Sequence, residues 1–347
     1  MKDFAKYNFE PLAIISNAVF GGGAEKSMLA LHKEFLNRGI DSHLLALNNG
    51  THTEEVLKII KFDRQWKEGP KATFFCFLHF RRVLKEINPK TIIVNCELPE
   101  LFISFVKLNR VRIIGVEHTT HPWFKKRFLG FFVRGFLRIK KIEWVTVSHG
   151  KNSIWLSKEI PRYIPNPFVE VKGNIKLASS KLSLSYIGGL KKNKRPEWVI
   201  WAGLKNGLEV NLYGAGSLEF YLKKKYSQHK DSIIFHGFKE NVWELIPKNS
   251  LVIVPSEFEG DGMVVLEAAI LGFPLLLSSN TDLLRFDFQS KHYFKDLNDL
   301  NYKIFQFKRN RSSIFIVENN KRDKLIANRS IRTIATTWLN MLSETKN

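Results

Sequence analysis

Two glutamates eight positions apart mark the segment of the chain with the clearest potential for chemistry. The sequence PSEFEGDGMVVLEAAILGFP, residues 255–274, places Glu259 and Glu267 around a glycine-containing loop. Carboxylates accept hydrogen bonds from hydroxyl groups, and glycines let a ligand approach the backbone closely. A helix predicted to begin at about Met263 would offer unpaired N–H groups to an anion. A plain strand–loop–helix turn, whose acids favour the helix dipole, would show the same pattern, so both interpretations stay open.

Two further loops carry groups that suit a phosphorylated ligand. The sequence YIGGLKKNKRPE begins at Tyr186 and joins a glycine turn to a basic cluster that includes Lys194. Such cations could neutralise a departing phosphate, although an exposed lysine-rich loop would look the same. The sequence LYGAGS, residues 212–217, supplies Gly214 and Gly216 directly after an apolar run. A single Gly-x-Gly is weak evidence, and its position between the basic loop and the two glutamates strengthens it.

Short apolar runs alternate with amphipathic stretches and would bring these loops together. In the first half of the chain, the predicted strands are residues 12–15, 43–47, 91–94, 112–116 and 144–147. In the second half, they are residues 184–187, 210–213, 233–236, 251–254 and 274–277. Helical patterns between them include residues 197–204 and 263–271. This alternation predicts an α/β protein with doubly wound parallel sheets, whose ligands bind at the carboxyl ends of the strands.

A proline-rich break divides the chain into two predicted domains. The stretch IPNPF, residues 164–168, is followed by a mostly polar segment up to residue 182, which is typical of an interdomain linker. We therefore expect an N-terminal domain at residues 1–168 and a C-terminal domain at residues 169–323. Residues 324–347 are predicted to contain one amphipathic helix, from about Lys324 to Ser343, that could pack back on the N-terminal domain.

Taken in order, the loops resemble the signature of the retaining glycosyltransferases of family 4, which have the GT-B fold. That signature is a glutamate, seven residues and a second glutamate, in a strand–EGxG–helix context that ends in Gly-x-Pro. Glu259, Glu267, Gly272 and Pro274 match it. The resemblance implies two Rossmann-like domains facing each other across a cleft, with retention at the anomeric carbon of the transferred sugar. It extends over nearly the whole chain and is strong from residue 184 to 278.

The same resemblance implies roles for individual residues. It implies that Glu259 contacts the donor sugar, that Glu267 holds the nucleotide ribose, and that Lys194 faces the leaving diphosphate. The loop amides would bind sugar hydroxyls, and the base would meet the backbone of FHGF, residues 235–238. The donor-binding residues of the C-terminal domain would be Gly214, Gly216, Phe238, Gly260, Asp261, Gly262, Met263, Val264 and Glu267. The N-terminal domain would bind the acceptor.

One position of the basic loop departs from the family pattern. Gly189 stands where the family usually has an arginine, so the bidentate contact with the diphosphate is missing at that position. Lys191, Lys192 or Arg195 could take over this contact, but a lysine offers a point charge rather than a fork. The departure leaves open a family member that binds nucleotide or glycan and has lost catalysis.

The N-terminal half offers two more candidates. Three glycines, residues 21–23, separate the first predicted strand from a helix and resemble the family's GG-AE loop, which lies beside the donor phosphates. They add Gly22 and Gly23 to the predicted donor-binding residues. His118 follows a strand where the family often places a histidine near the transferred sugar, with His121 as a neighbour. The predicted catalytic residues are therefore Glu259, Lys194 and His118. The alternatives are that the three glycines form a plain flexible turn and that His118 is a structural histidine.

The composition narrows the classes of partner. Among 347 residues, 54 are Lys or Arg and 33 are Asp or Glu, which gives a formal net charge of +21. Such a surface favours nucleic acid, an anionic membrane or phosphorylated substrates. The charge makes a nucleic-acid-binding protein one alternative. No basic stripe accompanies a nucleic-acid-reading motif, so no nucleic-acid partner is expected. Two cysteines, no apolar run long enough to span a bilayer and a poor signal peptide favour a cytoplasmic protein.

Residues 122–141, PWFKKRFLGFFVRGFLRIKK, suggest how the chain could meet a membrane. The segment has no acidic residue, and its aromatic residues recur at helical spacing. Of its basic residues, Arg127, Arg134, Arg138 and Lys141 can occupy the other side, and the segment also contains Lys125, Lys126 and Lys140. A basic aromatic helix suits an anionic bilayer surface. The alternative is that Phe128, Phe131, Phe132, Phe136 and Ile139 pack into the core of the N-terminal domain.

These features together predict a hexosyltransferase-type glycosyltransferase. It would move a sugar from a UDP- or GDP-linked donor to a glycan or lipid-linked acceptor, as in the synthesis of lipopolysaccharide, capsule or lipid-linked oligosaccharide. The chain has no Asp-x-Asp pair, so no metal and no cofactor are expected. We expect the protein in the cytoplasm, peripheral on the inner face of the cytoplasmic membrane.

Overall fold

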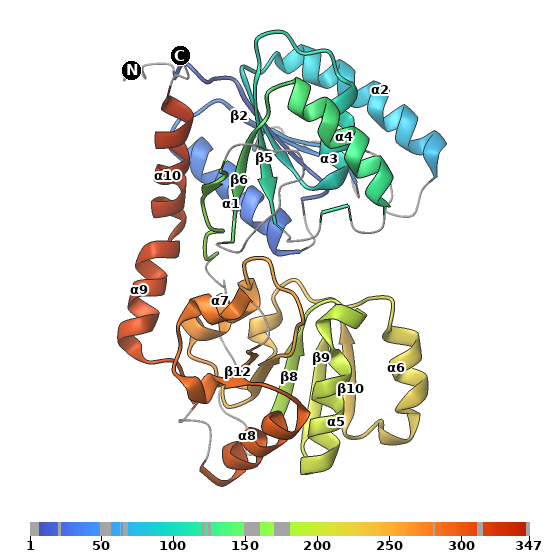
Figure 1. Ribbon diagram of the computed structural model, residues 1–347, viewed down its shortest axis with the longest axis vertical. Helices are drawn as coiled ribbons and strands as arrows, with labels where there is room; N and C mark the ends of the chain where they lie inside the picture. The colour runs from blue at the N-terminus through green and yellow to red at the C-terminus, as the bar shows by residue number, and fades with distance from the viewer. Residues whose placement is uncertain are drawn as a thin grey trace. The chain divides into compact units, whose positions relative to one another are not determined.

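The chain folds into two compact units in the computed structural model (Figure 1). Unit 1 comprises Met1–Val169 and Arg329–Asn347, and unit 2 comprises Glu170–Asn328. The residues that the structure describes are 7–19, 22–48, 57–62, 64, 69–118, 122–123, 126–148, 160–169, 181–279, 282–310 and 315–344. Gly21, His121, Lys125 and most of the predicted linker at 169–182 lie outside them.

Unit 1 is built on one parallel sheet with the strand order β3-β2-β1-β4-β5-β6-β7. Its central strands are buried on both faces, as a sheet with helices on both sides requires. The strands are β1 Leu12–Ser16, β2 Ser42–Ala46, β3 Ile59–Lys61, β4 Thr91–Asn95, β5 Arg112–Glu117, β6 Glu143–Thr146 and β7 Arg162–Tyr163.

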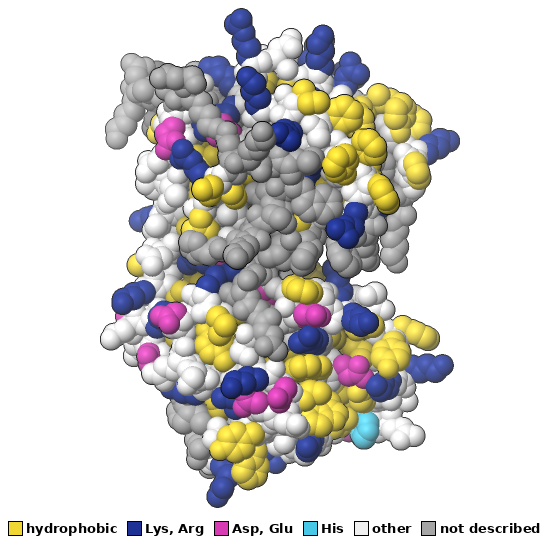
Figure 2. Space-filling model, viewed as in Figure 1, with side chains coloured by type: hydrophobic (Ala, Val, Ile, Leu, Met, Phe, Trp, Pro, Cys, Tyr) yellow, Lys and Arg dark blue, Asp and Glu magenta, His cyan; other side chains and the backbone are white. Residues whose placement is uncertain are grey.

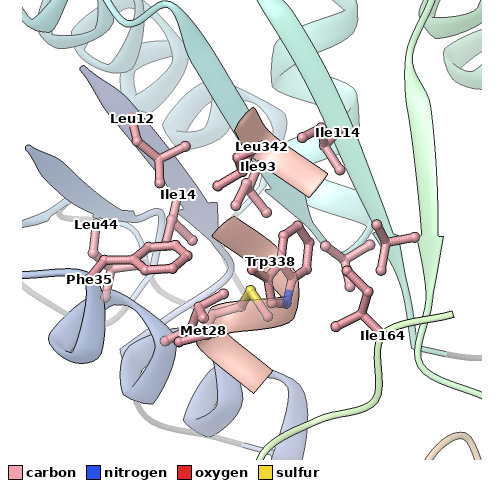
Figure 3. Close-up of a cluster of buried hydrophobic side chains, with 14 of the residues drawn as sticks. Leu12, Ile14, Met28, Phe35, Leu44, Ile93, Ile114, Ile164, Trp338 and Leu342 are labelled. Carbon is pink, nitrogen blue, oxygen red and sulfur yellow. The ribbon is translucent and has the colours of Figure 1, made fainter. Parts of the chain in front are cut away.

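Helices α1 (Gly23–Asn37) and α10 (Ile331–Ser343) cover one face of this sheet. Figure 3 shows Trp338 of α10 among side chains of α1 and of the sheet, including Met28, Phe35 and Ile93. Trp338 is 2% exposed, so the last helix of the chain completes the hydrophobic core on this face. Burying an aromatic side chain of this size contributes several kcal/mol through the hydrophobic effect.

Helices α2 (Pro70–Ile87), α3 (Glu97–Phe105) and α4 (Arg127–Ile139) cover the other face. They form one layer because ring contacts join neighbours. Phe77 of α2 lies 5.4 Å from Phe102 of α3, and Phe105 of α3 lies 5.9 Å from Phe136 of α4, measured between ring centroids.

The predicted single helix at the C-terminus is wrong. The chain forms two helices, α9 (Asn319–Arg329) and α10, with Ser330 between them. The Oγ of Ser330 accepts a hydrogen bond from the backbone N–H of Thr333 at 3.1 Å, which is an N-cap and marks the start of a new helix. The guanidinium of Arg112 donates to the carbonyls of Met341 and Leu342 at the far end of α10. A cation at a helix C-terminus stabilises it through the helix dipole.

Unit 2 repeats the plan with the strand order β10-β9-β8-β11-β12-β13, again with parallel pairing. Its strands are β8 Ser183–Ile187, β9 Glu209–Tyr213, β10 Ile233–Gly237, β11 Leu251–Val254, β12 Leu275–Ser278 and β13 Tyr293–Phe294. In addition to α9, which belongs to unit 2 up to Asn328, its helices are α5 Pro196–Asn206, α6 Glu219–Lys225, α7 Met263–Leu271 and α8 Leu297–Asn310. The predicted α/β class with parallel sheets is confirmed.

The orientation of helix α4 contradicts the prediction that its aromatic side chains pack into the core. It also corrects the predicted basic side of the helix, because Arg134 faces inward. Its inward face is Gly130, Val133, Arg134 and Leu137, whereas the phenylalanines face solvent. The aromatics therefore do not pack into the core of unit 1. Arg134, predicted as part of an exposed basic side, is 2% exposed and pairs with Glu100 at 2.8 Å and Glu117 at 2.7 Å. Among the described helices, none combines the length and apolarity that crossing a bilayer requires.

Candidate active site

Unit 2 brings its polar loops to the sheet edge where the strand order reverses. The chain runs outward from β8 to β9 and β10 and then returns to β11, on the other side of β8. In open parallel sheets, ligands bind at the carboxyl ends of the strands beside such a reversal. Lys194 follows β8 and Glu259 follows β11, so these two predicted residues border it.

Lys194 and Glu259 form an ion pair. The Nζ of Lys194 lies 2.7 Å from the Oε1 of Glu259, and the two side chains are 26% and 17% exposed. The Oγ of Ser256 donates to the same Oε1 at 2.7 Å, and the Lys194 Nζ donates to the carbonyl of Phe258 at 3.3 Å. A partly exposed pair contributes at most about 1 kcal/mol to folding. Its main effect is to hold a cation at the reversal.

The N-terminus of helix α7 opens at the same sheet edge. Its N-cap is Gly262, whose φ of 64° lies in the left-handed region. A Cβ at this position would also lie 2.7 Å from the Leu283 side chain, so glycine is required for two reasons. Glycine brings no capping side chain, and the first turn contains no acidic residue. The first N–H groups, those of Met263 and Val264, have no intrahelical acceptor, so this helix end favours an anion.

Arg285 supports the loop before α7 and was missed by the sequence reasoning. It lies in a short 3₁₀ helix at Asp282–Phe286, and its Nη2 donates to the carbonyl of Gly260 at 2.6 Å. The same atom lies 3.6 Å from the Oδ1 of Asp261, whose side chain is 1% exposed. Asp261 therefore directs its carboxylate to Arg285 rather than to solvent. Within the described residues, the Nε and Nη1 of Arg285 are buried and lack a hydrogen-bond partner.

The glycine pair after β9 is required by contact between two loops. A Cβ on Gly214 would lie 1.9 Å from the carbonyl oxygen of Gly188, and one on Gly216 would lie 2.4 Å from that of Leu190. The N–H of Leu190 donates to the carbonyl of Ala215 at 3.1 Å, which ties the two loops together. These glycines thus position the basic loop that carries Lys194. Their predicted contact with the nucleotide stays a prediction.

Two further predicted residues lie near the same edge. Glu267, in the second turn of α7, accepts a hydrogen bond from the Trp243 Nε1 at 2.8 Å, so its carboxylate already supports the core of unit 2. Phe238 follows β10 and is 56% exposed, which leaves its ring accessible to a flat ligand such as a base. Among the described side chains, no cluster of three or more His, Cys, Asp and Glu is placed to hold a metal ion.

Gly22 and Gly23 lie in unit 1, at the start of α1. The N–H of Gly22 donates to the Oε2 of Glu25 at 2.9 Å, and Glu25 is buried. The carboxylate of the helix's own first turn therefore occupies this N-terminus. The predicted contact of these glycines with donor phosphates stays a prediction.

His118, also in unit 1, directly follows β5. Its Nε2 is buried and, among the residues described, has no hydrogen-bond partner. Burial lowers the pKa of His118 to about 4, so the imidazole is neutral at physiological pH. A neutral imidazole can donate one hydrogen bond and accept another. By contrast, His32 in the same unit bonds Ser42 and Leu57 through its two nitrogens and is a structural histidine.

Comparisons with known proteins agree with these features. The family model "Glycosyltransferase Family 4" matches residues 21–151, and the model "Glycosyl transferases group 1" matches residues 181–286. The N-acetyl-alpha-D-glucosaminyl L-malate synthase of Bacillus anthracis is 31% identical over 121 residues, which are 33% of this chain. The match spans about a third of that relative, 32% of its length.

Solved structures share the fold over nearly the whole chain. HepE of Anabaena, in complex with UDP and glucose, has a TM-score of 0.75 and 15% identity, with 96% of this chain and 99% of that chain covered. Sucrose-phosphate synthase of Thermosynechococcus elongatus has a TM-score of 0.75 and 14% identity, with 95% and 97% covered. The lipopolysaccharide outer core galactosyltransferase WaaB has a TM-score of 0.62 and 17% identity, with 95% and 98% covered. These likenesses confirm the predicted GT-B fold class.

Proposed function

We propose that this chain, which belongs to the group 1 glycosyltransferases of family 4, transfers a hexosyl group from a nucleotide-sugar donor. The observation that carries the proposal is the Lys194–Glu259 pair at the strand-order reversal of unit 2. Beside it lies the open N-terminus of α7. A fixed cation, a helix dipole and unpaired N–H groups stabilise negative charge, as a departing diphosphate requires.

We propose a UDP- or GDP-linked donor and retention at the anomeric carbon. A UDP-linked donor is supported by HepE, which has been solved with UDP and with UDP-glucose. Retention is supported by the glutamate pair, Glu259 and Glu267, which matches the signature of the retaining enzymes. No metal or cofactor belongs to the proposal, because Lys194 and α7 supply the positive charge that the leaving group needs.

We propose a cell-surface glycan precursor, free or lipid-linked, as the acceptor. The net charge of +21 supports a working place at the inner, anionic face of the cytoplasmic membrane. The likeness to WaaB agrees with a substrate of this class, since that protein is named for the lipopolysaccharide outer core.

A second candidate function is binding of nucleotide or glycan without catalysis, and Gly189 favours it. The family's arginine is absent there. The atoms nearest to a Cβ built at Gly189 belong to the flexible Lys191 side chain, at 3.4 Å, so the backbone has room for a Cβ. Activity decides between the two candidates.

Thermal unfolding with a panel of UDP- and GDP-sugars tests the proposal, together with a donor-hydrolysis assay. A donor at about one hundred times its Kd stabilises the folded state by about 2.7 kcal/mol. Stabilisation by one donor class and slow hydrolysis of that donor are expected. Stabilisation without hydrolysis would favour the binding protein. A response to short DNA or RNA, with none to any nucleotide sugar, would overturn both candidates in favour of nucleic-acid binding.

A further inference from the structure

The outer surface of the α2–α3–α4 layer in unit 1 is unusually apolar. Ten of the twenty large hydrophobic residues that are exposed in the described part of the chain lie on these three helices. They form what we call the aromatic face: Phe74, Phe75, Leu78, Phe105, Phe128, Leu129, Phe131, Phe132, Phe136 and Ile139. Figure 2 shows hydrophobic side chains gathered over the region that α2 and α4 occupy in Figure 1. Isolated exposed apolar residues are normal, whereas a gathering of this kind marks an interaction site.

Helix α4 cannot turn its aromatic side chains into the core of unit 1. Arg134, on its inward face, is held by bidentate contact with Glu100, at 3.0 Å and 2.8 Å, and by Glu117 at 2.7 Å. Rotating the helix would leave these buried charges unpaired, which is strongly destabilising. On the same inward face, a Cβ on Gly130 would lie 2.4 Å from Trp123, so the glycine allows close packing there. The outward direction of the phenylalanines is therefore fixed by the inward face.

The charges around the aromatic face have one predominant sign. Between residues 70 and 141, the exposed acidic residues in the described part are Glu86 and Glu97. Glu86 pairs with Arg82, and Glu97 accepts a hydrogen bond from the N–H of Trp123. The exposed basic residues over the same range are Lys71, Arg81, Arg82, Lys85, Lys90, Lys107, Arg110, Lys126, Arg127, Arg138 and Lys141. By helical periodicity, Arg127 and Arg138 border the phenylalanine stripe of α4 on the side of Phe131.

We infer that the aromatic face is an interfacial membrane-docking surface, whose partner is an anionic lipid bilayer. The inference rests on the proposed membrane-located function and assigns it a surface and a mode of contact. The phenylalanines and Ile139 enter the boundary between headgroups and acyl chains, while the bordering arginines and lysines contact lipid phosphates. The mode differs from docking through a basic helix side, because Arg134 is unavailable and the apolar side chains make the deepest contact.

Vesicle co-sedimentation with matched variants of the full chain tests the inference. The test variant carries Phe128→Ala, Phe132→Ala and Ile139→Ala, which remove side chains that are 87%, 62% and 78% exposed. The control carries Phe220→Ala, Phe305→Ala and Ile326→Ala, which remove the same residue types from exposed helical positions of unit 2. Vesicles contain phosphatidylcholine with or without phosphatidylglycerol. A third variant, Arg127→Gln with Arg138→Gln, separates charge from apolar contact.

The test variant should lose at least tenfold in partitioning to the anionic vesicles, which is about 1.4 kcal/mol, and the control should not change. The arginine variant should bind anionic vesicles more weakly and neutral vesicles as the wild type does. Added salt should have the same effect on the wild type. Wild-type partitioning by the test variant would overturn the inference. So would self-association of the wild type that the same three changes abolish, with no vesicle binding, because a second copy would then cover the face. Thermal stabilisation by nucleotide sugars should persist in every variant, so a failure here is distinguishable from a failure of the proposed activity.

Discussion

Each unit begins a helix beside its strand-order reversal, on opposite sides of that reversal, and the two helix N-termini differ in chemistry. In unit 1, α1 follows β1 beside the reversal between β1 and β4, and Glu25 of its first turn accepts the hydrogen bond of the Gly22 N–H. In unit 2, α7 follows β11 beside the reversal between β8 and β11, and its first turn has no acidic residue. The first end is capped by a carboxylate of its own first turn, whereas the second has no such carboxylate and therefore favours an anion.

We infer from this difference that the side chains of the first turn decide whether such a helix N-terminus is available to an anion. At α7, Lys194 adds a cation that Glu259 holds in place. We therefore expect binding of the donor diphosphate to depend on unit 2 far more than on Gly22 and Gly23 of unit 1.

Lys194→Ala should cause the largest loss, because it removes the cation while leaving the open helix end. Turnover in donor hydrolysis should fall because the activation free energy rises by about 2–4 kcal/mol, as when one preorganised stabilising group is removed. Donor affinity should change less, since the charge develops in the transition state. Lys230→Ala removes an equal charge from an exposed position of unit 2 outside the basic loop and serves as the control. If Lys194→Ala turns over at the wild-type rate, Lys194 has no part in the mechanism.

Gly262→Ala should destabilise unit 2 by about 2–3 kcal/mol, because left-handed strain is combined with overpacking against Leu283. Gly207→Ala is the matched control. Gly207 has a φ of 60°, close to the 64° of Gly262, but a Cβ there would meet nothing within 4 Å. The control should therefore cost only about 1 kcal/mol. Urea unfolding measures both values, and equal costs would contradict the role of the Leu283 contact.

Glu267→Ala should destabilise unit 2 by about 1–3 kcal/mol, because the buried N–H of Trp243 loses its acceptor. This cost follows from the hydrogen bond that Glu267 accepts from the Trp243 Nε1. Glu267→Gln keeps an acceptor oxygen and should retain most of the stability. Calorimetry with the free nucleotide then isolates the ribose contact. Nucleotide affinity equal to wild type in the glutamine variant would remove Glu267 from the donor site.

Gly189→Arg should have the smallest effect and act in the opposite direction. An arginine there would add a fork for the diphosphate beside Lys194, and the nearest obstacle to its Cβ is a flexible lysine side chain. We expect donor affinity to rise by up to about tenfold, equivalent to about 1.4 kcal/mol. Gly189→Met matches the size without the charge and should leave affinity unchanged. A titration in which arginine and methionine behave alike would show that the missing fork is no handicap.

Most of the parallel strands could be predicted from the sequence because a buried strand is a continuous apolar run between polar segments. The strands that were missed, β3, β7 and β13, have two or three residues each, too few to show any pattern. Helix α7 was predicted with its bounds because Gly262 and Gly272 terminate it on both sides.

Other features depend on partners that are distant in the sequence. Arg134 is a basic residue on an aromatic helix until Glu100 and Glu117 are seen to enclose it. The periodicity of α4 places its phenylalanines opposite its arginines and so favours a buried phenylalanine face, whereas the structure buries Arg134 instead. Arg285 reaches the loop before α7 from twenty-five residues further along, with no local signal.

The return of the chain to unit 1 sets an order for folding during synthesis. Unit 2 is one continuous stretch, Glu170–Asn328, and all of it has been made before α10 exists. The core around Ile14 and Ile93 stays open until Trp338 leaves the ribosome. The half of the protein that is translated first is therefore completed last, and a ribosome that stalls near residue 328 displays a finished unit 2 beside an unfinished unit 1. Until then, the apolar side chains that await α10 are the part of the nascent chain most exposed to chaperones and to aggregation.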